Sequence, residues 1–197
     1  MSKTLEFYFD VGSPTAYLAH KELPKIASEY NAELVYEPML LGAVHKATNN
    51  IPPGLVPEKG KYMMLQDLPR FVRRYGVPFQ MNPFFPVNTL SMMRGCYAAQ
   101  QMGVFDQYVD AIFDAMWVKG LNMGDESIFK QVLEEKGIDA DALIGLIADP
   151  AIKDKLKNNT AKAVEKGCFG APTMFIGEEM YFGQDRLDFI REELAKG

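Results

Sequence analysis

The sequence predicts an α/β protein in which a small sheet is interrupted by a large helical insertion. Strand-like segments occur near the two ends of the chain, whereas apolar residues at helical spacing fill the middle. In chain order the end segments alternate as β-α-β and then β-β-α. We expect residues 1–40 and 167–197 to form one discontinuous domain and residues 41–166 to form the insertion.

The first unit is a strand, a helix and a second strand. Leu5–Asp10 is short and rich in aromatic residues, and a glycine follows it, as is typical of a strand that ends in a turn. Ser13 and Pro14 suit a helix start, because serine caps helices and proline lacks the N–H that a first turn leaves unpaired. Pro24 is expected to split or kink this helix. Glu33–Pro38 is the second strand, parallel to the first.

The middle of the chain is predicted to form helices separated by proline-rich loops. Prolines gather at 51–57 and 77–86, which predicts a break at each place. Pro69 is expected to kink or end the first of these helices. The predicted helices are Lys59–Tyr75, Asn88–Met102, Val104–Val118, Asp125–Glu135, Ala140–Ala148 and Ala151–Lys166.

Strand-like segments return after Gly167. Pro172–Ile176 and Met180–Phe182 flank a short turn with Gly177, which predicts a hairpin, and Asp185–Lys196 has the apolar spacing of a helix. With the insertion set aside, the order β-α-β then β-β-α is that of the thioredoxin fold. We therefore predict a thioredoxin-like fold with a large all-helical insertion.

Composition and charge exclude several classes of protein. The chain has 197 residues, 48% of them hydrophobic, and a net charge of −5, so it lacks the basic surface that binds nucleic acid. No apolar run approaches the roughly 18–20 residues that span a bilayer, and the first residues show no signal-peptide pattern. Cys96 and Cys168 lie far apart and form neither a disulfide framework nor a metal-ligand spacing. We expect a cytoplasmic protein without a metal site.

The segment Ser13–Ala16 occupies the turn at which thioredoxin-fold redox proteins carry Cys-x-x-Cys. Serine and alanine replace the two cysteines, so this turn cannot exchange disulfides. What remains is a hydroxyl at a helix N-terminus, where free N–H groups and the helix dipole stabilise an anion such as a thiolate. Because the turn has no thiol, the thiol would arrive with a cofactor. The alternative is that Ser13 only caps its helix.

Three further segments suit the binding of a peptide such as glutathione. A cis proline in Ala171–Pro172 would expose the backbone of the preceding residue to an extended peptide. The pair Gln184–Asp185 could hold the ammonium of a γ-glutamyl group, and Asn50 with Lys59 could clamp a terminal carboxylate. Each has a structural alternative: a proline at a strand start, a helix N-cap, a loop and a solvated lysine.

Other polar and aromatic residues are expected to be structural. Arg94 is expected to pair with a carboxylate rather than to bind substrate, and His20 and His45 have no partner at catalytic or metal-ligand spacing. Methionine and aromatic side chains at helical spacing are more often core than pocket lining. The residues concerned are Phe84, Phe85, Met92, Met93 and Trp117.

Together these motifs resemble the 2-hydroxychromene-2-carboxylate isomerases, which belong with the kappa-class glutathione transferases to the DsbA-like thioredoxin superfamily. The resemblance spans essentially the whole chain. The motifs that carry it are Phe7–Pro14, Asn50–Tyr62 and Gly167–Leu187.

The resemblance implies a role for each candidate residue. Ser13 would hydrogen-bond the sulfur of glutathione and favour its thiolate, as the catalytic residue. Asn50 and Lys59 would bind the rest of the tripeptide, the backbone of Ala171 would pair with its cysteinyl residue, and Gln184–Asp185 would hold the γ-glutamyl group.

The function that the resemblance implies is a glutathione-dependent isomerase of an aromatic carboxylate. It would convert a 2-hydroxychromene-2-carboxylate to a trans-o-hydroxybenzylidenepyruvate through reversible thiolate addition and bond rotation. Relatives imply a role in aromatic degradation and a homodimer. Two alternatives stay open: a kappa-class-like glutathione transferase, and a non-catalytic thiol- or peptide-binding module on the same fold.

Overall fold

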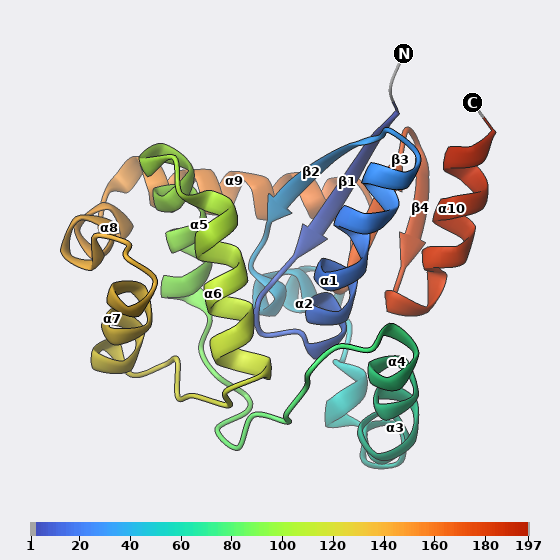
Figure 1. Ribbon diagram of the computed structural model, residues 1–197, viewed down its shortest axis with the longest axis horizontal. Helices are drawn as coiled ribbons and strands as arrows, with labels where there is room; N and C mark the ends of the chain where they lie inside the picture. The colour runs from blue at the N-terminus through green and yellow to red at the C-terminus, as the bar shows by residue number, and fades with distance from the viewer. Residues whose placement is uncertain (1–2, 197) are drawn as a thin grey trace.

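A four-stranded sheet forms the centre of the molecule in the computed structural model, which describes residues 3–196 (Figure 1). β1 (Thr4–Phe9) pairs in parallel with β2 (Glu33–Pro38) and antiparallel with β3 (Thr173–Ile176). β3 pairs antiparallel with β4 (Glu179–Phe182), so the strand order is β2-β1-β3-β4. The two ends of the chain therefore meet in one sheet, and the predicted thioredoxin-like fold is confirmed.

Helices cover both faces of this sheet. Leu5 and Phe7 of β1 belong to the hydrophobic cluster formed with α1 (Pro14–Glu29) and α10 (Leu187–Ala195). Tyr8, between Phe7 and Phe9, instead belongs to a cluster with residues of α2 (Leu41–Thr48) and α9 (Pro150–Glu165). This alternation follows from the strand period of two, which sends successive side chains to opposite faces. Figure 1 shows α1 in front of the sheet and α9 behind it.

The middle of the chain is helical, as predicted. Buried residues of its helices join the cluster that contains β1 and α1, so the insertion and the sheet share one core. The predicted domain boundaries stay a prediction, and their parts at residues 1–2 and 197 lie outside the described residues. The remaining helices are α3 (Pro57–Tyr62), α4 (Leu68–Tyr75), α5 (Leu90–Met102), α6 (Phe105–Trp117), α7 (Glu126–Glu135) and α8 (Ala140–Ile147).

The two helix-breaking predictions for proline have different outcomes. α1 continues through Pro24, so the predicted split is wrong; Leu23 and Ile26 on either side are fully buried, and their burial offsets one lost backbone hydrogen bond. By contrast, the predicted helix that contains Pro69 is divided. A π-helical turn, Met63–Asp67, separates α3 from α4, and Pro69 lies in the first turn of α4, where no N–H is needed.

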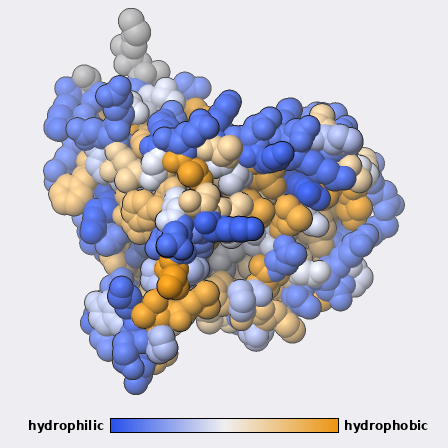
Figure 2. Space-filling view, turned by 180° about the vertical axis from the view of Figure 1, so that it is seen from behind, coloured by the Kyte–Doolittle hydropathy of each residue, from blue (hydrophilic) through white to orange (hydrophobic). Residues whose placement is uncertain are grey.

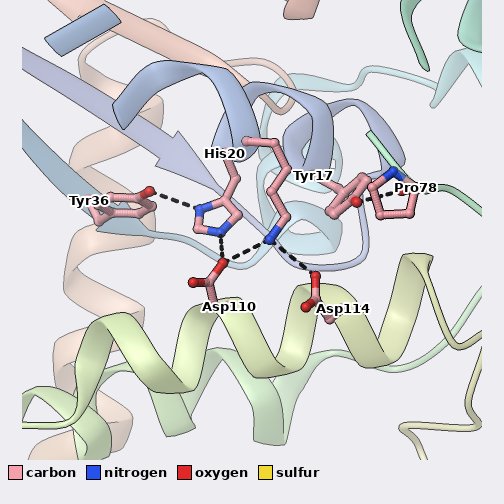
Figure 3. Close-up of polar contacts among 7 residues, drawn as sticks. Tyr17, His20, Tyr36, Pro78, Asp110 and Asp114 are labelled. Atoms are coloured by element: carbon pink, nitrogen blue, oxygen red, sulfur yellow. Dashed lines mark hydrogen bonds and ion pairs between the residues drawn. The ribbon is translucent and has the colours of Figure 1, made fainter. Parts of the chain in front are cut away.

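A polar cluster around the buried His20 ring fastens α6 to α1 and β2 (Figure 3). The His20 ring lies between the Tyr36 hydroxyl, 2.8 Å from Nδ1, and Asp110 Oδ1, 2.8 Å from Nε2. Lys21 Nζ lies 2.8 Å from Asp110 Oδ1 and 3.1 Å from Asp114 Oδ1. Because Asp110 accepts hydrogen bonds, His20 donates from Nε2, and a neutral ring then accepts the Tyr36 O–H at Nδ1. His20 is therefore a packing residue, as expected, and its polar partners belong to this structural cluster.

The Asp110 carboxylate should make stability depend on acid. The hydrogen bond from His20, with Lys21 beside it, holds the pKa of Asp110 well below its usual range. Such a carboxyl stabilises the fold above its unfolded pKa of about 3.9, and this contribution disappears as pH falls through the lower, folded pKa. We therefore expect Asp110→Asn to lower the urea midpoint at neutral pH and the gap to the native chain to narrow toward about pH 2.

The matched control is Asp106→Asn, which removes the same charge from an exposed position in the first turn of α6. This variant loses only the weak interaction of a surface carboxylate with the helix dipole, so it should lower the urea midpoint much less than Asp110→Asn does. A gap between Asp110→Asn and the native chain that stays constant across the acid range would contradict the assignment.

Candidate active site

A cavity of about 600 Å³ opens where β1 ends and α1 begins. Its size lies within the roughly 300–1,000 Å³ that is typical of small-molecule sites. Segments far apart in the sequence line it: the β1–α1 turn, α2, residues 50–68, residues 85–89 and the loops beside β3 and β4. Five of the seven predicted site residues are among its lining residues, namely Ser13, Asn50, Ala171, Gln184 and Asp185.

Ser13 caps α1 and also faces the loop before β3. Its Oγ accepts a hydrogen bond from the Ala16 N–H at 3.1 Å and lies 3.1 Å from the Ala171 carbonyl oxygen, to which it donates. Ser13 can therefore cap the helix and donate to a ligand at the same time. Capping uses a lone pair of the oxygen, so the hydroxyl proton stays available for another acceptor.

Thr15 is a second hydroxyl at this helix start, which sequence reasoning missed. Its Oγ1 lies 3.0 Å from Ser13 Oγ and 3.3 Å from the Ala171 carbonyl oxygen. When Ser13 turns its proton toward a ligand, Thr15 can keep that carbonyl hydrogen-bonded. Within residues 3–196 the Thr15 N–H has no acceptor. A free N–H at the positive end of a sixteen-residue helix favours an anion in the cavity.

Asp10 is a buried carboxylate that holds the turn in place. Its Oδ1 accepts from the Gly12 N–H at 2.8 Å, and its Oδ2 accepts from the Leu41 N–H at 2.8 Å and from the Thr89 hydroxyl at 3.0 Å. Burial raises the pKa of Asp10, while these three donors favour its charged form. Asp10 therefore ties together the turn before Ser13, the start of α2 and the segment before α5.

The loop before β3 contributes backbone groups. The Ala171–Pro172 peptide bond is cis, as predicted. Pro172 itself is buried and does not line the cavity, but its carbonyl accepts from the Gly183 N–H at 3.0 Å. Among the described residues, nothing accepts a hydrogen bond from the Ala171 N–H. This loop therefore presents one unused donor beside Ser13.

A tight turn after β4 places Gln184 and Asp185. Gly183 has a φ of +101°, and a Cβ at this position would collide with Asp185 Oδ1, so only glycine fits. The Gln184 carbonyl oxygen accepts from the Tyr75 hydroxyl at 2.5 Å, and Asp185 Oδ2 pairs with Arg186 at 2.5 Å. Asp185 is not the N-cap of α10, whose cap position is occupied by Arg186. The Asp185 carboxylate thus stays at the cavity wall.

Asn50 and Lys59 differ in where the structure puts them. The Asn50 side-chain amide donates to the Phe169 carbonyl oxygen at 2.8 Å, which links the insertion to the loop before β3. Lys59 is exposed on α3 and is not among the residues that line the cavity. The structure therefore brings Asn50, but not Lys59, to the other site residues.

The rest of the cavity wall is mainly apolar, with one titratable ring. Met92, Met93 and Trp117 are core residues, as expected, but Phe85 lines the cavity and Phe84 is exposed, so the expectation is wrong for these two. His45 of α2 also lines it, and burial lowers the pKa of His45, which favours the neutral ring. Hydrophobic surface gathers on the lobe that carries α3, beside this cavity (Figure 2). Its exposed apolar side chains include Ile51, Leu55 and Leu65.

Neither cysteine can serve as a thiolate in this cavity. Cys96 and Cys168 are both fully buried, and neither lines the cavity. Burial raises the pKa of Cys96 well above its ordinary value and that of Cys168 to about 12. A thiolate at Ser13 would therefore belong to a ligand.

Residues 3–196 contain neither a membrane-spanning helix nor a cluster of metal-ligating side chains. The described helices are too short or too polar to cross a bilayer. No group of three His, Cys, Asp or Glu side chains converges there as metal ligands would.

The fold and site match known proteins. The family model of the DSBA-like thioredoxin domain matches residues 4–195. A 2-hydroxychromene-2-carboxylate isomerase from Sphingobium xenophagum is 33% identical over 98% of this chain and 99% of its own. Glutathione S-transferase kappa 1 from Homo sapiens is 27% identical over 100% of this chain and 92% of its own. A solved structure of a 2-hydroxychromene-2-carboxylate isomerase superimposes with a TM-score of 0.88 at 31% identity, covering 98% of this chain and 95% of that one.

These matches define the class of protein first: a DsbA-like thioredoxin fold whose relatives are isomerases and glutathione transferases. Within that class, the chain belongs to the family of the 2-hydroxychromene-2-carboxylate isomerases, as its motifs indicated.

Proposed function

We propose that this protein is a glutathione-dependent isomerase of a chromene-type aromatic carboxylate. One observation carries the proposal. The Ser13 hydroxyl and the unused N–H groups of Thr15 and Ala171 meet in a cavity that no cysteine of the chain lines. The residues present fit glutathione, because Thr15 and Ala171 offer free donors and Asp185 offers a carboxylate. We propose that the protein acts as a cytoplasmic homodimer without nucleic acid or membrane partners.

Ser13 and Thr15 would have different roles in the reaction. Glutathione, when bound, would supply a thiolate that adds reversibly to a conjugated substrate and so permits rotation about a bond. Ser13 would donate its hydroxyl proton as a hydrogen bond to the sulfur; a serine hydroxyl is too weak a base to remove a proton at neutral pH. Thr15 would keep the Ala171 carbonyl satisfied meanwhile.

The tripeptide would be held by four groups. The backbone of Ala171, ahead of Pro172, would pair with the cysteinyl residue. Gln184 and Asp185 would hold the γ-glutamyl ammonium, for which Asp185 must share its carboxylate with Arg186. Asn50 would bind the tail of the tripeptide, and Lys59 stays a prediction for the same role.

The second candidate is a kappa-class-like glutathione transferase, favoured by the full-length similarity to human kappa 1. In that reaction the adduct leaves as product, whereas an isomerase returns the thiol. Incubation with glutathione and 2-hydroxychromene-2-carboxylate separates the two. Turnover that leaves the glutathione concentration unchanged supports the isomerase. Loss of one glutathione per product formed supports the transferase. Absence of any turnover overturns both.

The γ-glutamyl assignment predicts weaker binding in Asp185→Asn. Losing the carboxylate removes a charged hydrogen-bond acceptor, so the Kd for glutathione should rise about tenfold in calorimetry. The control is Asp188→Asn, which removes an exposed carboxylate three residues on that pairs with Arg74 and does not line the cavity. Equal Kd values for the two variants would refute the assignment.

The tail assignment of Lys59 is tested against its neighbour Lys61, which is equally exposed on α3. Lys59→Ala should raise the Kd for glutathione by about threefold to tenfold, because a lysine–carboxylate contact near the surface is worth about 1 kcal/mol. Lys61→Ala should leave it unchanged. If Lys59→Ala also binds as the native chain does, the tail is held elsewhere.

A further inference from the structure

A second cleft, of about 240 Å³, lies on another side of α2. α2, α5 and α9 bound it, and α9 lies against both other helices (Figure 1). Leu41 and Gly42 line the large cavity, whereas Leu40 and Ala43 line this cleft. The two spaces are therefore separate, with the start of α2 between them.

Three cations surround the cleft. Arg94 of α5 is half-buried, and Lys153 and Lys157 of α9 are exposed. Within residues 3–196 these three side chains make no ion pair and no hydrogen bond, so the expected carboxylate partner of Arg94 is absent there. In a chain of net charge −5, a group of three such cations with no carboxylate among the lining residues favours a bound anion.

The walls between these cations are apolar. Leu40, Ala43, Leu90 and Leu156 line them. The one hydroxyl in the lining, Thr160 Oγ1, already accepts from the Leu40 N–H at 3.0 Å and donates to the Leu156 carbonyl at 2.7 Å. A ligand that fits must therefore combine an apolar body with a single anionic head. The cleft is smaller than most drug-sized sites, so that body is small.

We propose that this cleft binds a small carboxylic acid with an apolar body. The carboxylate would lie against the guanidinium of Arg94, whose planar donors match its two oxygens, with Lys153 and Lys157 adding charge. The apolar body would lie against the leucine walls. This site is independent of the proposed function, because it shares no lining residue with the large cavity.

Calorimetry of the full chain with 2-naphthoate tests the proposal. Because the large cavity can also take an aromatic carboxylate, the readout is a saturable binding step that disappears or weakens in Arg94→Gln. Arg94→Gln should raise the Kd about tenfold, because it removes the paired donors. The matched control is Lys155→Gln, which removes one charge from the same helix at an exposed position outside the cleft. The control should bind as the native chain does. Equal Kd values for the two variants, or no saturable binding to the native chain, would overturn the proposal.

Two further probes separate the charge from the apolar body. 2-Naphthamide keeps the rings without the charge, and inorganic phosphate keeps charge without the rings; both should bind at least about tenfold more weakly than 2-naphthoate. Phosphate that binds as tightly as 2-naphthoate would refute the role of the apolar walls. Naphthoate binding that persists unchanged in Arg94→Gln would lie elsewhere and would likewise refute the site.

Discussion

Replacing Ser13 with alanine is expected to lower kcat for the proposed isomerisation by about 10²–10³-fold, the usual cost of losing one hydrogen bond aimed at a reacting anion. The Ser13 hydroxyl lines the cavity and can release its present acceptor, the Ala171 carbonyl, to the Thr15 hydroxyl. Stopped-flow absorbance of the substrate at saturating glutathione measures the effect. The Kd for glutathione should change much less than kcat.

Ser13 also caps α1, so its loss will cost about 1 kcal/mol of stability as well. Asp125→Ala provides a control for this cost, because the Asp125 side chain also accepts from a backbone N–H in the first turn of a remote helix, α7. Both variants should lose similar stability, but only Ser13→Ala should lose turnover. Equal kcat values in the two variants would show that Ser13 acts only as a cap.

Replacing Trp117 with alanine is expected to reduce the free energy of unfolding by about 3–5 kcal/mol. Trp117, at the end of α6, is fully buried and stacks on Phe79 with ring centroids 6.1 Å apart. Its indole N–H donates to the Val11 carbonyl oxygen at 2.7 Å. Removal therefore leaves a large cavity in the shared core and an unpaired carbonyl two residues before Ser13. Urea denaturation followed by circular dichroism measures the loss.

Trp117→Phe separates the two parts of this effect. Phenylalanine fills most of the space but cannot donate, so it should cost about 1–3 kcal/mol, the penalty for a buried acceptor without a partner. The alanine variant should cost clearly more than the phenylalanine variant. A cost below about 1 kcal/mol for Trp117→Ala would contradict the view that α6 anchors the β1–α1 turn.

The sequence was sufficient for the fold because the signals for its elements are local. The aromatic-rich segment of β1, the Ser13–Pro14 helix start and the glycine of the β3–β4 turn are each visible within a few neighbouring residues. Pro24 was misjudged because what holds α1 together there is burial against distant parts of the chain. Tertiary packing overrides local propensity at such positions.

The same division applies to the site. Motif residues around Ser13 and Gln184 were identified because their chemistry is visible within a few positions. The role of Asp10 was not, because two of its partners lie far away in the chain: Leu41 is 31 residues and Thr89 is 79 residues from Asp10. Lys59 was assigned from its motif alone. Whether its side chain reaches the cavity depends on how the helices of the insertion pack, and residue spacing in the sequence does not determine that packing.

Titrating the sulfur of glutathione bound to the native protein tests the central claim most directly. The ultraviolet absorbance of a thiolate reports its ionisation as pH is varied, with glutathione in solution as the reference. The free N–H of Thr15 and the hydroxyl of Ser13 should bring the thiol pKa clearly below the ordinary value of about 8.5. A bound thiol that ionises at the same pH as free glutathione would contradict the account.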